Sequence, residues 1–186
     1  EGIKVLKKLW SGEAVSHSSK FYSFEDVPMQ PPARQVGGPP IWCGGRSDAA
    51  LRRAGRLSDG YVSYVITPDM FADALGKIEV AAQEVDRSIE SFGTGHLLFM
   101  RIDDTYEKAL DVATETLSVR YAMDFRKAAQ RYAALGTPAQ VGEKIREFHA
   151  AGVRHIMLDL LGPYEERSAQ IERFAAEAMP LLDDLR

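Results

Sequence analysis

Four consecutive residues, Gly44, Gly45, Arg46 and Ser47, carry the clearest chemical signal in the sequence. They follow a short apolar run and precede a helical pattern, so they form the turn from a predicted strand into a predicted helix. The glycines let a ligand approach the backbone closely, while the N–H groups that begin a helix and the guanidinium of Arg46 favour an anion. The turn could therefore bind a phosphate. The alternative is a tight turn in which Ser47 or Asp48 merely caps the helix.

A carboxylate interrupts the last apolar run of the chain. Asp159 lies within the predicted strand 155–161, where a carboxylate is costly unless it is paired or lines a polar cavity. It is either a site residue or the partner of an arginine in a buried ion pair. Tyr64 and Thr67 lie near the carboxyl end of the predicted strand 61–66, where they could line a pocket. We favour the alternative roles, core packing and helix capping.

The four histidines are poorly placed for catalysis, because ligands of parallel α/β folds bind at the carboxyl ends of the strands. His96 and His155 are predicted to begin strands, at the opposite end. His149 lies near a helix end and His17 in a hairpin, so we interpret all four as structural or solvent-facing. Cys43 is interpreted as a small core residue. The sequence contains no nucleophile–base pair, metal cluster or Walker-type loop, and we assign no catalytic residue and no metal ligand.

Composition excludes several classes of protein. The 186 residues carry 23 basic and 27 acidic side chains, a net charge of −4, which disfavours binding to nucleic acid or to an anionic membrane. No apolar stretch approaches the roughly 20 residues of a membrane-spanning helix. A single cysteine excludes an internal disulfide framework, so a reducing, cytoplasmic setting is the expectation.

From Pro40 onward, apolar runs typical of strands alternate with amphipathic helical patterns. The predicted strands are 41–43, 61–66, 96–102 and 155–161. The predicted helices are 47–57, 67–85, 105–135 with a break near Met123, 137–152 with a capping box at its start, and 165–185 with a bend or end at Pro180. Strands separated by helices pair in parallel through right-handed crossovers.

Four such βα units form either an open doubly wound α/β sheet or half of a (β/α)8 TIM-type barrel, which normally needs about 250 residues. The chain opens inside a helical pattern at residues 3–10, which favours the C-terminal half of a barrel, strands five to eight. Residues 11–38 are predicted to be a hairpin and proline-rich excursion. We therefore expect residues 1–186 to be a single partial barrel domain, with residues 40–186 holding the four βα units.

Several segments resemble bacterial luciferase-like oxidoreductases. They are the helix end with Trp-Ser-Gly at 10–12, the run Pro-Pro-Ile-Trp-Cys-Gly-Gly at 39–45, residues 50–61, Gly-Thr-Pro at 136–138 and Ala-Gly-Val at 151–153. Together they cover nearly the whole chain. The resemblance implies a (β/α)8 barrel enzyme that uses reduced FMN or coenzyme F420, as a monooxygenase or a hydride-transferring oxidoreductase.

By this resemblance the cofactor phosphate would contact Gly44, Gly45, Arg46 and Ser47. The contacts that would distinguish FMN from F420, and most contacts to substrate, would lie upstream. A small-molecule substrate is implied, and the remaining half of the barrel would come from a missing N-terminal half or a homodimer. Two alternatives stay open: a non-catalytic half-barrel that acts as a binding or assembly module, and a flavin-independent barrel enzyme that binds a phosphorylated substrate.

Overall fold

The computed structural model describes residues 1–185 as an α/β fold built on a five-stranded, parallel sheet. Its strands are β3 (Trp42–Gly44), β4 (Gly60–Tyr64), β5 (Gly93–Ile102), β6 (Ala134–Gly136) and β7 (His155–Leu160). The long strand β5 is central. Met100 pairs with Ala134 of β6 on one edge and with Leu160 of β7 on the other, and β4 pairs with the first half of β5.

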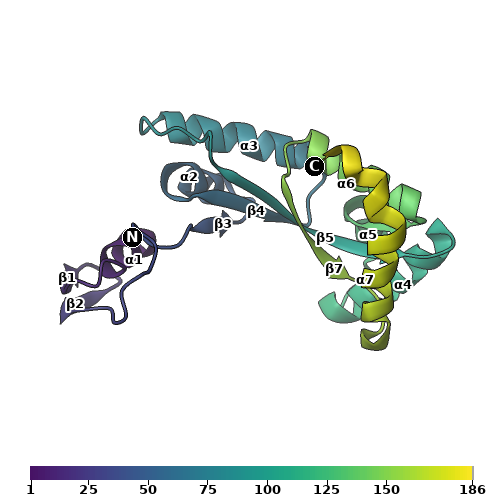
Figure 1. Cartoon of the computed structure of the whole chain (residues 1–186), viewed down its shortest axis with the longest axis horizontal. Helices are drawn as coiled ribbons and strands as arrows, with labels where there is room; N and C mark the ends of the chain where they lie inside the picture. Colours follow the sequence, from purple (N-terminus) through teal and green to yellow (C-terminus); the bar gives the residue numbers. More distant parts are fainter. Residues whose placement is uncertain (186) are drawn as a thin grey trace.

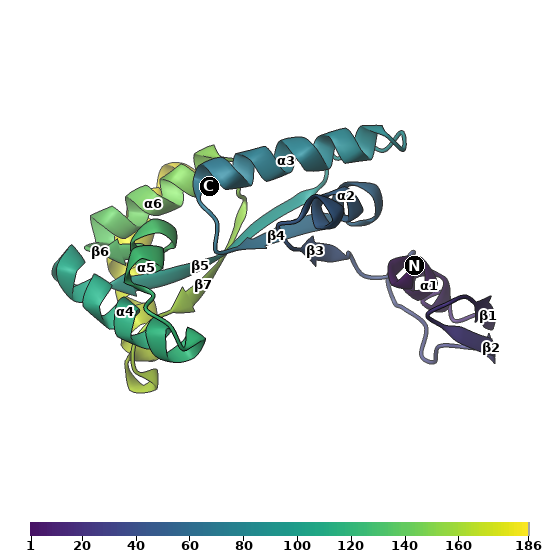
Figure 2. The same ribbon diagram turned by 180° about the vertical axis from the view of Figure 1, so that it is seen from behind.

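The N-terminal part forms a separate small unit at one end of the molecule (Figure 1). It consists of α1 (Gly2–Leu9) and an antiparallel hairpin of β1 (Val15–Ser18) and β2 (Ser23–Val27). An extended, proline-rich segment connects it to β3, and the view from behind shows the same separation (Figure 2). The predicted hairpin and extended connection are thus confirmed.

Helices follow the strands as the alternating pattern predicts. They are α2 (Asp48–Leu57), α3 (Pro68–Gln83), α4 (Tyr106–Tyr121), α5 (Arg126–Tyr132), α6 (Pro138–Ala150) and α7 (Arg167–Arg173), with short non-α turns at Tyr164–Glu166, Phe174–Ala178 and Met179–Leu185. Side chains of Ser47, Thr67, Thr105 and Thr137 cap four of them. At α6 the predicted capping box with Gln140 is confirmed.

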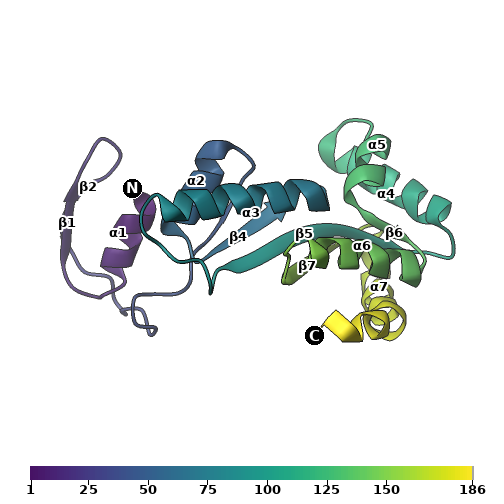
Figure 3. The same cartoon turned by 90° about the horizontal axis from the view of Figure 1, so that it is seen from above.

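The two faces of the sheet are covered unequally. On one face, buried side chains such as Tyr61 and Leu98 pack against helices α2, α3 and α6; Figure 3 shows α3 and α6 lying over the strands. On the other face, α4 and α5 cover the carboxyl end of β5 around Phe99. The rest of that face leaves Trp42 36% and Met157 42% exposed.

Several predicted boundaries were wrong, each for a physical reason. Residues 134–136 are a buried strand rather than the end of a helix, because they pair with β5. The described part of residues 40–186 therefore holds five parallel strands, not the predicted four. The predicted strand 61–66 ends at Tyr64, since Val65 has a φ of +54°. His96 is the fourth residue of its strand, because β5 already begins at Gly93.

The other two corrections concern helix ends. The stripe of α3 stops before Val85, which is 44% exposed beyond the C-cap at Glu84. The last predicted helix, 165–185, keeps α-helical bonding only from Arg167 to Arg173, and a 3-10 turn starts directly before Pro180. Proline lacks the N–H that an α-helix needs at this position.

Candidate functional site

A cleft of about 770 Å³ lies at the carboxyl ends of β3, β4 and β7. Its lining residues are Gly44, Gly45, Arg46, Val62, Ser63, Tyr64, Val65, Leu97, Tyr121, Phe125 and Asp159. Three of the four predicted phosphate-binding residues therefore line one cavity, together with Tyr64 and Asp159, which the sequence had marked as candidates. Thr67 lies outside it and caps α3, as its alternative interpretation predicted.

The turn at Gly44 and Gly45 needs both glycines. Gly45 has a φ of +114°, and a Cβ there would lie 2.7 Å from the Cβ of Ala50. A Cβ on Gly44 would lie 3.2 Å from the carbonyl oxygen of Val62. The Tyr61 hydroxyl donates to the carbonyl of Gly45 at 3.0 Å, which fixes the orientation of that peptide.

The start of α2 leaves backbone donors unused. Within residues 1–185, the backbone N–H groups of Arg46 and Ser47 have no hydrogen-bond partner. The hydroxyl of Ser47 accepts from the N–H of Ala50 at 3.3 Å, so this side chain caps the helix. Asp48 points outward to Lys77, 3.2 Å away, and is 85% exposed. Its carboxylate therefore does not block an anion from the turn.

Arg46 crosses from this turn to the next one. Its guanidinium donates to the carbonyl oxygen of Val65 at 3.0 Å. No carboxylate within the described part of the chain forms an ion pair with it. Its positive charge thus lies at the cleft without a compensating group, beside the unused N–H groups, and this combination suits a phosphate.

A second polar cluster lies at the other side of the cleft. Arg120, at the end of α4, donates to both carboxylate oxygens of Asp159, at 2.6 and 3.3 Å. The neighbouring Tyr64 hydroxyl is hydrogen-bonded to that of Tyr121. Burial, followed by this hydrogen bond, raises the pKa of Tyr64 above its usual value. Asp159 is thus both a cleft residue and the partner of an arginine, which joins the two interpretations that the sequence left open.

Sequence reasoning missed Arg120, Tyr121 and Phe125. Tyr121 and Phe125 stack with ring centroids 4.8 Å apart where α4 turns into α5. The predicted break near Met123 was the one available signal, because it places this turn beyond the carboxyl end of β5.

The remaining candidates lie away from the cleft. His96 is buried, stacks on Phe148 and hydrogen-bonds Ser63 at 2.7 Å. His17 pairs with Glu1. His155 contacts the edge of Trp42. These are structural contacts, as predicted.

No group of three or more histidine, cysteine or acidic side chains that could hold a metal occurs within residues 1–185. Across the same residues, no helix has the length and apolar character needed to cross a membrane.

Comparisons with known proteins identify the family and the fold of the chain. The sequence model of the family described as "Luciferase-like monooxygenase" matches residues 1–155. An F420-dependent glucose-6-phosphate dehydrogenase of Microbacterium testaceum is 24% identical over 98% of the chain and 59% of its own length. An FMNH(2)-dependent dimethylsulfone monooxygenase of Pseudomonas putida is 26% identical over 100% of the chain and 58% of its own length.

A solved structure shares the fold. An F420-dependent secondary alcohol dehydrogenase, determined with an F420–acetone adduct, superposes with a TM-score of 0.82 at 18% identity. The superposition covers 98% of the chain and 60% of that protein. The chain thus spans about three fifths of the length of these matches.

Proposed function

The chain belongs to the luciferase-like monooxygenase family, and we propose that it supplies the phosphate-binding turn of an oxidoreductase that uses FMN or coenzyme F420. Gly44, Gly45, Arg46 and the backbone N–H of Ser47 would hold the cofactor phosphate. The observation that carries this proposal is the pair of unpartnered backbone N–H groups, those of Arg46 and Ser47, beside an arginine side chain without a carboxylate partner. Relatives of both cofactor types are similar to the chain over nearly its whole length.

The residues present fit a phosphate. The space that a Cβ on Gly45 would fill stays open, and Asp48 is turned away toward Lys77. Val62 and Leu97 line the adjoining part of the cleft, where apolar walls would exclude water from a bound ring. A flavin or deazaflavin, when bound, supplies the redox chemistry, and these residues would bind and orient it.

We propose further that residues 40–186 form strands five to eight of a (β/α)8 barrel, with residues 11–38 as an excursion before them. The four barrel strands would be β3, β4, β5 and β7, and β6 would be an additional short strand beside the last three residues of β5. The uneven cover of the sheet supports this. Parallel sheets are normally buried on both faces, yet Trp42 and Met157 remain exposed on the face without α2, α3 and α6. The first half of a barrel would cover that face. Its source would be another part of the native protein, because the chain matches only 59% of a family relative.

The half-barrel is tested by the intact mass and the size-exclusion volume of the native protein. We expect a mass well above the 20.6 kDa of this chain. A native mass of 20.6 kDa with dimeric elution would instead indicate that a second copy covers the bare face. A stable monomer of these 186 residues alone would contradict the half-barrel.

The phosphate site is tested with FMN and riboflavin, which differ in the phosphate alone, in the native full-length protein. Arg46→Ala should weaken FMN binding by about tenfold or more, the effect of one charge-assisted hydrogen bond, and leave riboflavin binding unchanged. Arg53→Ala is the matched control, because Arg53 lies exposed on α2, the helix that follows the turn. Coenzyme F420 and its phosphate-free deazaflavin core form the second pair of ligands.

Gly45→Val tests the backbone part of the same site. The control is Gly37→Val, since Gly37 also has a left-handed φ, +83°, but nothing within 4 Å of its Cβ position. We expect loss of FMN or F420 binding in the first variant alone. Unchanged affinity in both Gly45→Val and Arg46→Ala would remove the phosphate assignment. Binding of neither cofactor by the unmodified protein would favour a flavin-independent enzyme or a non-catalytic module.

A further inference from the structure

The charges around the cleft are separated. Only two of its lining residues carry an ionised side chain, Arg46 and Asp159. Arg46 lies at the phosphate-binding turn. Asp159 lies on β7, at the side formed by the aromatic rings of Tyr64, Tyr121 and Phe125. The two ends of the cleft therefore present different chemistry.

The charge of Asp159 is cancelled locally. Arg120 reaches it from α4 with two charge-assisted hydrogen bonds, at 2.6 and 3.3 Å. The guanidinium does not itself line the cleft. It also lies 5.9 Å from the ring centroid of Phe99, a position that favours a cation over the aromatic face. Both side chains are only 22–33% exposed, so solvent screens the pair less than a surface ion pair.

We propose that the Arg120–Asp159 pair makes this end of the cleft electrically neutral and thereby selects an uncharged, largely apolar substrate. The inference rests on the proposed function, which places the cofactor phosphate at Arg46 and leaves the aromatic end for the substrate. A free guanidinium there would attract an anionic substrate, and a free carboxylate a cationic one. With the pair intact, either ion would have to break two charge-assisted hydrogen bonds before it gained one.

The test uses three probes of one shape and different charge: benzamide, benzoate and benzylammonium. Their affinities are measured by calorimetry on the native full-length protein saturated with FMN or coenzyme F420, so that the cofactor phosphate already occupies Arg46. The unmodified protein should prefer benzamide. Asp159→Asn releases the positive charge and should raise the benzoate-to-benzamide affinity ratio by about tenfold. Arg120→Gln releases the negative charge and should raise the benzylammonium ratio by a similar factor, while the double variant should return to the neutral preference.

Asp184→Asn is the matched control. Asp184 also receives two hydrogen bonds from one arginine, Arg146, but on the exposed surface far from the cleft. It should leave all three ratios unchanged. The inference is overturned if the unmodified protein binds an ion better than benzamide or binds none of the probes. It is also overturned if the ratios stay constant in variants whose circular dichroism remains native.

The FMN and riboflavin titrations separate this failure from failure of the proposed function. Variants at Asp159 and Arg120 should keep the preference for FMN over riboflavin, because Arg46 is untouched. Constant probe ratios with that preference intact would contradict the substrate inference alone. Loss of the preference already in the unmodified protein would contradict the proposed function.

Discussion

The guanidinium of Arg46 donates a 3.0 Å hydrogen bond to the carbonyl oxygen of Val65, a β-branched residue with a φ of +54°. This bond joins the turn after β3 to the turn after β4. The left-handed backbone also breaks the alternation of β4, so that Tyr64 and Val65 both line the cleft. Such a conformation is unfavourable for a β-branched side chain and is found mainly where surrounding structure enforces it, often at functional sites.

The strain at Val65 predicts an inverted order of two substitutions. Val65→Ala and Val65→Gly both remove the two methyl groups that pack against the cluster around Phe99. Glycine also loses the Cβ, but only glycine adopts a positive φ without cost. We expect the glycine variant to be more stable than the alanine variant by about 1 kcal/mol in urea unfolding.

Val62 provides the control, because it lies in the regular part of β4. There the order should be normal, with glycine less stable than alanine by about 0.5–1 kcal/mol. The same order at both positions would show that Val65 is not strained.

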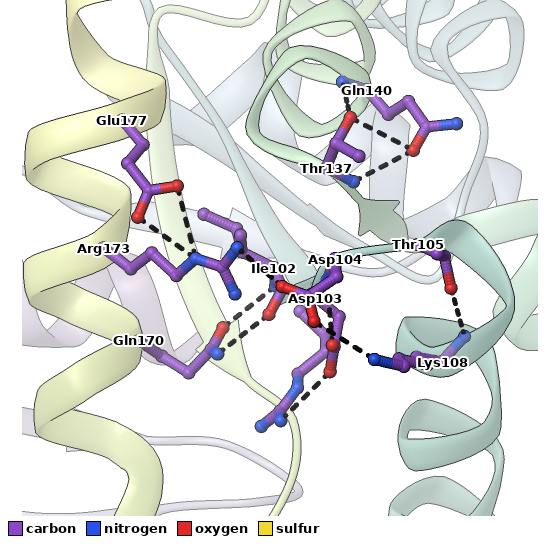
Figure 4. A network of polar contacts seen from close by, with 11 residues as sticks. Ile102, Asp103, Asp104, Thr105, Lys108, Thr137, Gln140, Gln170, Arg173 and Glu177 are labelled. Carbon is purple, nitrogen blue, oxygen red and sulfur yellow. Dashed lines mark hydrogen bonds and ion pairs between the residues drawn. The ribbon is translucent and has the colours of Figure 1, made fainter.

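The side chain of Gln170 forms two hydrogen bonds with the backbone at the end of β5. Its amide donates to the carbonyl of Ile102 and accepts from the N–H of the same residue, both at 2.9 Å (Figure 4). The pairing of β7 with β5 ends at Met100 of β5, two residues before Ile102. The side-chain amide of Gln170 therefore bonds the backbone of Ile102 where a further residue of β7 would otherwise do so. Gln170→Leu leaves two buried backbone groups unpaired and should lower the free energy of unfolding by about 3 kcal/mol.

Gln83→Leu is the comparison for this change, since Gln83 is exposed at the end of α3. Its effect on the urea midpoint should stay within about 0.5 kcal/mol. Equal effects of the two substitutions would mean that Gln170 contributes nothing specific.

Local patterns predicted the turn at residues 44–47, because these residues are adjacent in the sequence and lie between a clear strand and a clear helix. They did not predict the far side of the cleft. Arg120 meets Asp159 across 39 residues, and Tyr64 meets Tyr121 across 57. Arg120 and Tyr121 lie on α4, where their spacing in the sequence is that of a solvent-facing stripe. Their position at the cleft depends on how α4 packs against the sheet, and no local pattern encodes that packing.

The same limit applies to the sheet. Apolar runs predicted four strands, because buried parallel strands leave that signal. The three residues of β6 are too few to show a period of two, and their helical neighbours masked them. The left-handed Val65 gave no signal, since a valine is typical of a continuing strand.

Trp42 fills a hollow that glycines on two neighbouring strands leave. A Cβ on Gly93 would lie 2.1 Å from the indole, and on Gly60 or Gly95 2.5 and 2.8 Å from it. Gly93→Ala should therefore cost about 1–3 kcal/mol through overpacking and should change the tryptophan fluorescence. In a Trp42→Leu background the same substitution should cost little, because the clash is gone.

The control for Gly93→Ala is Gly76→Ala, at a position on α3 with nothing within 4 Å of the Cβ. It should stabilise the protein by about 0.5–1 kcal/mol. If Gly93→Ala cost as much without the indole as with it, Trp42 would not be the reason for the glycine.

The buried His96 predicts a dependence of stability on pH. Burial lowers its pKa to about 4, whereas an unfolded histidine titrates near about 6.5. Between these values the unfolded chain binds a proton that the folded chain does not, so stability falls as the pH falls. The loss of stability begins near pH 6.5, is complete near pH 4 and is on the order of 3 kcal/mol.

His96→Asn should remove most of this dependence of the unfolding free energy on pH in urea titrations between pH 7.5 and 5. This holds even if the lost stacking on Phe148 weakens the fold at every pH. An unchanged slope in His96→Asn would assign the acid sensitivity to other groups.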